Sequence, residues 1–205
     1  MKHIGRIRIK KKEVNFRSKQ KKILSIILAL VSIGLIVLAD QYSKYVVIQN
    51  MTPYVDEIDV IGDYFVIYHI WNTGTAWGLF ADRIPLLLVI TVIVFLLLTY
   101  VFKNIAFQKR YRAIRYCMIM IVGGAIGNLI DRVRLGHVTD FLYAKVINFP
   151  IFNVADIFVT LPVILLVILM IFYYTGDDFD VVIGEKVLLE DGTYKDKKEK
   201  KSQDN

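Results

Sequence analysis

The sequence has only one cysteine and three histidines among its 205 residues. The single cysteine, Cys117, excludes a disulfide framework and a zinc site built from cysteines. The histidines His3, His69 and His137 form no H-E-x-x-H motif, so the usual zinc peptidase pattern is also absent. We therefore expect no metal and no other cofactor.

Charge is absent from four long apolar runs, at residues 23–39, 84–102, 116–130 and 157–174. As helices they would be about 22 to 28 Å long, close to the ~30 Å hydrocarbon thickness of a bilayer once flanking residues are added. None shows the polar stripe that a soluble bundle helix exposes. We predict an all-α membrane protein with four transmembrane helices, the first being retained and not cleaved as a signal peptide.

Lysine and arginine are missing from residues 46–81, although 26 of them give the chain a net charge of +7. Ten lie in residues 1–22 and five in residues 103–115. Short basic segments remain in the cytoplasm, so both termini are expected there, with residues 40–83 and 131–156 on the outer face. The positive charge then describes orientation in a membrane, and we expect no nucleic-acid binding.

The chain accordingly divides into a basic cytoplasmic segment (1–22), a four-helix transmembrane domain (23–174) and a charged cytoplasmic tail (175–205). In the tail we expect a small hairpin around Gly184, followed by a disordered end. Gly123 and Gly127 form a small-xxx-small pair that would let the third helix pack closely on a neighbour.

The first outer segment contains a β-branched and aromatic run at residues 64–71, which predicts a strand, and residues 72–76 predict a turn. A small β-rich loop region on the extracytoplasmic side would result. With Trp71 and Trp77 near the interface it could cover a substrate. A simple interfacial aromatic belt explains the same residues.

Ionisable and amide side chains gather where the outer ends of the helices are expected. They are Asp40, Lys44, Asn72, Asn128, Asp131, Arg132, Asp140, Asn153 and Asp156. Singly, each has a structural explanation: an i,i+4 ion pair, an Asp-Arg pair at a helix end, or a cap of the fourth helix. Because such groups are costly at membrane depth, their number on one face favours a functional site.

The residue inventory limits the chemistry of that site. Ser43 is the only serine in the outer segments, and its neighbour Lys44 points away from it on a helix. Cys117 lies near the inner end of the third run. Paired carboxylates remain, since two aspartates sharing one proton can activate a water without a covalent intermediate. The composition leaves open which two of the four outer aspartates form that pair.

Five ordered segments resemble the motifs of the lipoprotein signal peptidase (signal peptidase II) family. They are Asp40-Gln-Tyr-Ser-Lys44, Asn72-Thr-Gly-Thr-Ala-Trp-Gly-Leu-Phe80, Gly123-Gly-Ala-Ile-Gly-Asn128-Leu-Ile-Asp131-Arg132, Val138-Thr-Asp140-Phe141 and Phe152-Asn153-Val-Ala-Asp156. The family consists of four-helix aspartic peptidases of the bacterial inner membrane. They remove the signal peptide of prolipoproteins by cutting before the lipid-modified cysteine.

The resemblance implies roles for the outer residues. It assigns the catalytic pair to Asp140 and Asp156, and the proton is expected more on Asp140 because the dipole of the fourth helix favours an ionised Asp156. Four residues would orient the substrate or hold the pair: Asn72, Asn128, Arg132 and Asn153. Three would support the site: Asp40, Lys44 and Asp131.

The resemblance also implies partners and location. We expect lipid-modified prolipoproteins as substrates, contact with membrane lipids, a monomer, and an active site near the extracytoplasmic face of the bacterial inner membrane. The alternative is a small ion- or proton-coupled membrane carrier whose aspartates bind the ion. A carrier should have polar groups near the midplane, whereas here they cluster at the outer ends.

Overall fold

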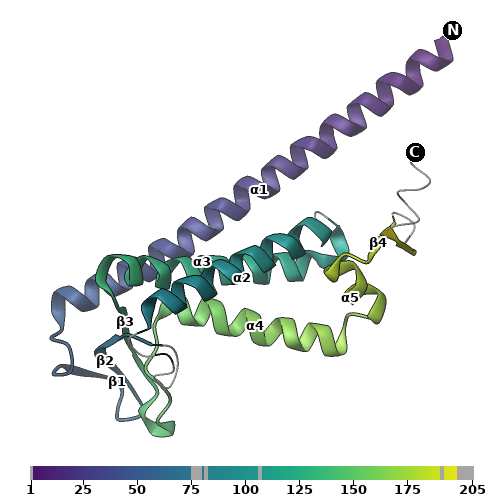
Figure 1. The fold of residues 1–205 in the computed structure, drawn as a ribbon. Helices are drawn as coiled ribbons and strands as arrows, with labels where there is room; N and C mark the ends of the chain where they lie inside the picture. Colours follow the sequence, from purple (N-terminus) through teal and green to yellow (C-terminus); the bar gives the residue numbers. More distant parts are fainter. Residues whose placement is uncertain (1, 75–79, 81–82, 106–107, 190–191, 198–205) are drawn as a thin grey trace.

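Four helices are long and apolar enough to cross a membrane, which confirms the predicted architecture. A computed structural model describes the backbone of residues 2–74, 80, 83–105, 108–189 and 192–197, and side chains from Gln20 onward. The helices are α1 (Lys2–Asn50), α2 (Ile84–Ile105), α3 (Arg112–Leu135) and α4 (Val154–Phe172). Helix α1 runs eleven residues past the apolar run that ends at residue 39, and it includes Asp40 and Lys44, which were expected near its end. Its N-terminal half extends beyond the other helices (Figure 1).

Helix α3 is the central helix, and it packs against α1, α2 and α4. Small residues allow this close packing. A Cβ added at Gly123 would lie 2.8 Å from the Ile36 side chain of α1, and one at Gly127 would collide with the carboxylate of Asp40. The prediction of a small-xxx-small packing face is therefore confirmed.

A three-stranded antiparallel sheet lies at one end of the bundle (Figure 1). Its strands, in spatial order, are β1 (Glu57–Ile61), β2 (Phe65–Asn72) and β3 (Val138–Tyr143), and a 3-10 turn η3 (Lys145–Ile147) follows. The strand predicted at residues 64–71 is thus confirmed as β2, whereas β1 and β3 were not predicted. Of the expected turn, residues 75–76 lie outside the described residues, as does Trp77.

One part of the sheet is anchored on the C-terminal end of α1. Phe141 of β3 is buried against Val47, in the last turn of α1, and Met51, the residue after the helix. The same strand pairs with β2, with Ile70 opposite Asp140 and Asn72 opposite Val138. Strand β3 is therefore fixed both to a membrane helix and to the neighbouring strand.

The tail folds at the opposite end of the bundle (Figure 1), and here the sequence prediction was wrong. Residues expected to form a hairpin around Gly184 belong to helix α5 (Gly176–Ile183), and the hairpin consists of β4 (Lys186–Leu188) and β5 (Tyr194–Asp196). Thr175 and Asp178 form a capping box at the start of α5. Gly184 ends the helix with φ 86°. These two end signals outweigh the β-branched residues between them. The expected disordered end falls at residues 198–205, outside the described residues.

Asp178 joins the tail to the bundle. Its fully buried carboxylate accepts two hydrogen bonds from Arg110, both at 2.5 Å, one from Tyr111 at 2.9 Å and one from Tyr194 at 2.7 Å. Arg110 and Tyr111 lie in the 3-10 turn η2 (Lys109–Tyr111) that precedes α3. We call the segment from Thr175 to Lys197 the inner cap.

Candidate active site

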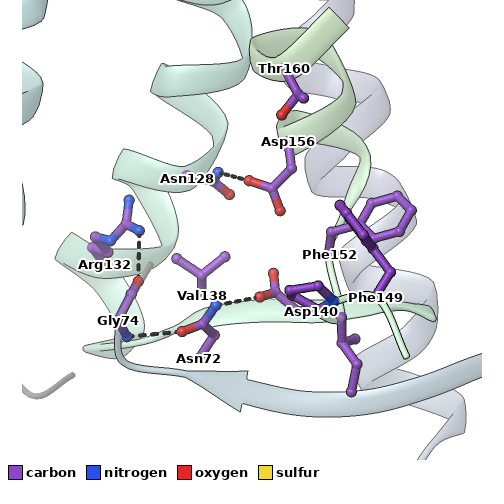
Figure 2. Close-up of a pocket in the computed structure, with 12 residues that line it drawn as sticks. Asn72, Gly74, Asn128, Arg132, Val138, Asp140, Phe149, Phe152, Asp156 and Thr160 are labelled. Atoms are coloured by element: carbon purple, nitrogen blue, oxygen red, sulfur yellow. Dashed lines mark hydrogen bonds between the residues drawn. The ribbon is translucent and has the colours of Figure 1, made fainter. Parts of the chain in front are cut away.

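All nine polar residues singled out in the sequence lie together between the sheet and the neighbouring helix ends. Helix α1 contributes Asp40 and Lys44, α3 contributes Asn128, Asp131 and Arg132, and the start of α4 contributes Asn153 and Asp156; strands β2 and β3 contribute Asn72 and Asp140. Hydrogen bonds connect them into one network, parts of which Figure 2 shows.

Asp140 is 1% exposed, and two amide groups hold its carboxylate. Asn72 Nδ2 donates to Oδ2 at 2.7 Å, and Asn153 Nδ2 donates to Oδ1 at 2.6 Å. Burial and, to a lesser extent, the charge of Asp156 together raise the pKa of Asp140 to about 7, although the hydrogen bonds from the two amides oppose the shift. The Asp140 carboxyl therefore titrates near neutral pH.

Asp156 lies in the first turn of α4, where it forms a capping box with Asn153. Asn153 Oδ1 accepts from the Asp156 amide at 3.0 Å, and the Asn153 amide donates back to Asp156 Oδ2 at 3.0 Å. Asp156 Oδ1 accepts from Asn128 Nδ2 at 2.8 Å. Asp156 thus takes part in capping α4, which was one of the structural explanations considered for it. It also borders the pocket that Asp140 borders.

Asn153 connects the two carboxyl groups. It caps α4 through Asp156, and the same side chain donates to Asp140 and to Asn128 Oδ1. It is fully buried. One amide therefore fixes the position of both acids relative to each other.

Lys44 is the cation of the network, and it is buried. Its Nζ lies 2.9 Å from Asp40 Oδ2, 3.0 Å from Asp131 Oδ2 and 3.0 Å from Asn128 Oδ1. Because the Asn128 oxygen faces this cation, its NH₂ group must face Asp156. The Asp40–Lys44 pair is therefore part of a buried cluster and not a helix-surface ion pair.

The two aspartates bound to Lys44 also hold neighbouring elements in place. Asp40 Oδ1 accepts from the Ala155 amide at 2.9 Å, which fixes the start of α4. Asp131 Oδ2 accepts from the Thr139 amide at 3.1 Å, which fixes the start of β3. The cluster thus connects α1 and α3 to the two segments that carry Asp156 and Asp140.

Arg132 does not pair with its sequence neighbour Asp131. Its NH2 group donates to the Gly74 carbonyl at 3.2 Å, and the Gly74 amide donates to Asn72 Oδ1 at 2.9 Å. Asp131 is held instead by Lys44 and by Gln41 Nε2, 2.9 Å from Oδ1. The explanation of a local Asp-Arg pair is therefore wrong.

A pocket of about 280 Å³ lies beside the two acids. In Figure 2, Asn128 and Arg132 lie on the left, the rings of Phe149 and Phe152 lie on the right, and Asp140 and Asp156 lie between them. A pocket with one polar and one apolar wall suits a peptide whose backbone lies along the polar wall and whose apolar side chains lie against the rings. Among its lining residues, the sequence analysis gave no role to Gly74, Phe149, Phe152 or Thr160, nor did it give one to Gln41 beside the pocket.

The histidines of the sheet region, His69 and His137, do not line the pocket. His69 Nδ1 is 3.1 Å from the Met51 carbonyl, and the His137 ring stacks 5.0 Å from Trp71. Within the part of the chain that the structure describes, no three His, Cys, Asp or Glu side chains are grouped to hold a metal ion.

Four membrane-spanning helices and two carboxyl groups on one pocket, Asp140 buried and Asp156 partly buried, define a multi-pass membrane protein with an aspartic-type site. The model of the family "Signal peptidase (SPase) II" matches residues 16–172. The chain belongs to this family of aspartic peptidases.

Curated relatives agree with this assignment. The chain is 40% identical to the lipoprotein signal peptidase of Caldanaerobacter subterraneus subsp. tengcongensis over 146 residues, which cover 71% of this chain and 97% of the relative. It is 39% identical to that of Bartonella tribocorum over 148 residues, 70% of this chain and 86% of the relative. The inner cap lies beyond the residues that the family model matches.

Two solved bacterial membrane enzymes have the same fold. The first, determined by the in meso method at 2.3 Å resolution, gives a TM-score of 0.64 at 32% identity and covers 70% of this chain and 87% of its own. The second, at 1.9 Å resolution, gives 0.61 at 30% identity, with 72% and 94% covered.

Proposed function

We propose that this chain removes signal peptides from prolipoproteins by cutting before the diacylglyceryl-modified cysteine, with Asp140 and Asp156 as the catalytic pair. The observation that carries the proposal is the placement of both carboxyl groups on one pocket, each held by asparagine amides. The relatives are lipoprotein signal peptidases, which supports the substrate class. Nothing in the family assignment favours the ion-coupled carrier.

The two carboxyl groups take complementary roles in this mechanism. Asp156 lies at the positive end of the α4 dipole, which favours the ionised base, and Asp140 carries the proton. Asp156 takes a proton from a water, the hydroxyl attacks the scissile carbonyl, and Asp140 protonates the developing oxyanion. Collapse of this diol intermediate breaks the C–N bond: one diol hydroxyl returns its proton to Asp140, and the amine leaves with the proton that Asp156 received.

The surrounding residues orient the reacting groups. Asn72 and Asn153 fix the Asp140 carboxyl, and Asn128 fixes Asp156 from the other side. Arg132, bound to the Gly74 carbonyl at the pocket wall, presents cationic N–H groups to a substrate backbone. Asp40, Lys44 and Asp131 support the site by fixing the elements that carry it.

The membrane contributes to substrate positioning. A diacylglyceryl chain holds the modified cysteine at the depth of the lipid headgroups, close to strand β3 and the start of α4, which carry the acids. We place the protein as a monomer in the bacterial inner membrane, in contact with its lipids. Its basic segment (1–22) and charged tail (175–205) are cytoplasmic, and the site of the four-helix domain (23–174) lies near the extracytoplasmic face.

Cleavage of a lipidated prolipoprotein by the purified protein tests the proposal. Asp140→Asn and Asp156→Asn should each lower kcat by about 100- to 10,000-fold, because each removes a general acid or base. Asp63→Asn is the matched control, since the Asp63 side chain is 92% exposed, and it should retain full activity. Full activity of either pocket variant would contradict the catalytic pair. Loss of wild-type cleavage in EDTA would indicate a metal-dependent reaction instead.

A further inference from the structure

One threonine differs from the other serines and threonines of the four spans. Ser25, Ser32, Ser43, Thr91 and Thr99 each donate to a carbonyl of their own helix, at 2.7 to 2.9 Å. Thr160 of α4 is the sixth, and among the described residues its hydroxyl has no hydrogen-bond partner. A hydroxyl without a partner is unfavourable at membrane depth, so a bound ligand would stabilise it.

The position of Thr160 is set by how α4 packs. Ala155 and Val159, four residues apart, lie against Gly124 of α3. Asp156 and Thr160 follow them by one residue each and share the adjacent stripe of the helix, which borders the pocket. Figure 2 shows the Thr160 side chain one turn along α4 from Asp156, with its oxygen on the pocket side.

Thr160 therefore lies deeper in the membrane than the acids. Four helical residues correspond to about 6 Å along the axis, which an extended peptide covers in about two residues. The part of a prolipoprotein that crosses the bilayer is the signal peptide, so its last residues run along this wall. On the opposite side, Phe149 and Phe152 offer only aromatic surface.

We propose that the Thr160 hydroxyl binds the signal peptide by donating a hydrogen bond to a backbone carbonyl about two residues before the scissile bond. This inference rests on the proposed function, because it requires a signal peptide in the pocket. Thr160 is then a substrate-binding residue that fixes how far the peptide enters the site.

Three variants test this role in nanodiscs with a synthetic diacylglyceryl peptide. Thr160→Val keeps the shape and removes the hydroxyl, so kcat/KM should fall about 3- to 10-fold, through KM, as expected for one lost hydrogen bond. Thr160→Ser restores the hydroxyl and should restore KM. Thr99→Val is the matched control, because the Thr99 hydroxyl already donates to Phe95, and it should behave as wild type. Thermal unfolding of all three verifies that they fold.

A second substrate locates the bond. This peptide keeps the lipid and the scissile bond. On the signal-peptide side it has only one residue before that bond, so the proposed acceptor carbonyl is missing. Wild type should lose about the same factor as Thr160→Val loses on the long peptide, and the variant should show no further defect. Normal KM of Thr160→Val, failure of Thr160→Ser to recover, or an undiminished defect on the short peptide would each overturn the inference. If the wild type cleaves neither peptide, the proposed function itself is wrong.

Discussion

The hydrogen bond from Asn72 to Asp140 should set the upper pH limit of the enzyme. Asn72 Nδ2 donates to Asp140 Oδ2 at 2.7 Å, and this bond favours the ionised carboxylate. In the proposed mechanism Asp140 works in its protonated form, so activity is lost as the pH rises through its pKa of about 7. Asn72→Leu removes the donor and puts an apolar side chain of similar size in its place. The pKa of Asp140 should therefore rise, and activity should persist to higher pH.

The size of the effect follows from the strength of that bond. A hydrogen bond to a charged group contributes about 1.5 to 3 kcal/mol, and one pKa unit corresponds to about 1.4 kcal/mol. Loss of the bond should move the falling limb of the pH profile by about one to two units, to between about pH 8 and pH 9. Asn153 still donates to the other oxygen, so the carboxyl group keeps one of its two amide partners.

The measurement is kcat/KM against pH with a lipidated peptide, since this ratio reports the free enzyme. Asn50→Leu is the control, because the exposed Asn50 side chain bonds only to its own helix, at the Val46 carbonyl. Its profile should match that of the wild type. A falling limb in Asn72→Leu that stays in place or moves to lower pH would refute a protonated Asp140 as the acid.

Three further variants address the supports of the site and of the cap. Lys44→Met leaves two buried carboxylates without their cation and should lower the free energy of unfolding by about 3 to 5 kcal/mol; Lys145→Met, at a surface pair, should leave thermal unfolding unchanged. Gly127→Ala places a methyl group on the carboxylate of α1 and should destabilise the bundle, whereas Gly34→Ala meets nothing within 4 Å and should be neutral or slightly stabilising in the same unfolding assay. Burial raises the pKa of Asp178, but hydrogen bonds from the arginine of η2 and from the cap itself outweigh this and hold it well below its usual range. Its stabilising effect is therefore present above about pH 4 and is lost as the pH falls further, so limited proteolysis should release the inner cap at low pH, and at neutral pH in Asp178→Asn.

The number of helices could be predicted from the sequence, but not the end of the first one. The apolar run ends at residue 39, and Asp40 and Lys44 were expected to lie at the end of the helix, with no signal for the residues that follow. Helix α1 continues to Asn50 because those two side chains neutralise each other and are bound by α3. Such compensation depends on Asp131, which lies 87 positions after Lys44 in the sequence, and it has no local signal.

The tail shows the opposite case, in which a local signal was present and overlooked. Residues 181–183 are β-branched and favour a strand by propensity. Thr175 and Asp178 have the spacing of a capping box, and Gly184 is a helix stop nine residues later. Ends of this kind predict a short helix more reliably than the propensity of the residues between them.

For the site, the sequence indicated which residue types take part and that they gather at one end of the helices. The contacts between them could not be predicted without the fold. Elimination left four aspartates, and their partners depend on the register of β3 on β2 and on the cap of α4. Gln41 was missed because it stood beside Asp40 within a motif. Thr160 was missed because a threonine in an apolar helix is ordinary, although its i+4 spacing from Asp156 places both on one face.

The inner cap has a consequence for how the protein is made. Arg110 precedes α3, and its partner Asp178 lies 68 residues later, after the last span. During synthesis Arg110 therefore lacks its partner Asp178 until α4 and the start of the tail have been made. The Arg110–Asp178 contact can form only after all four spans and the start of the tail have been synthesised, so we expect this end of the bundle to close late.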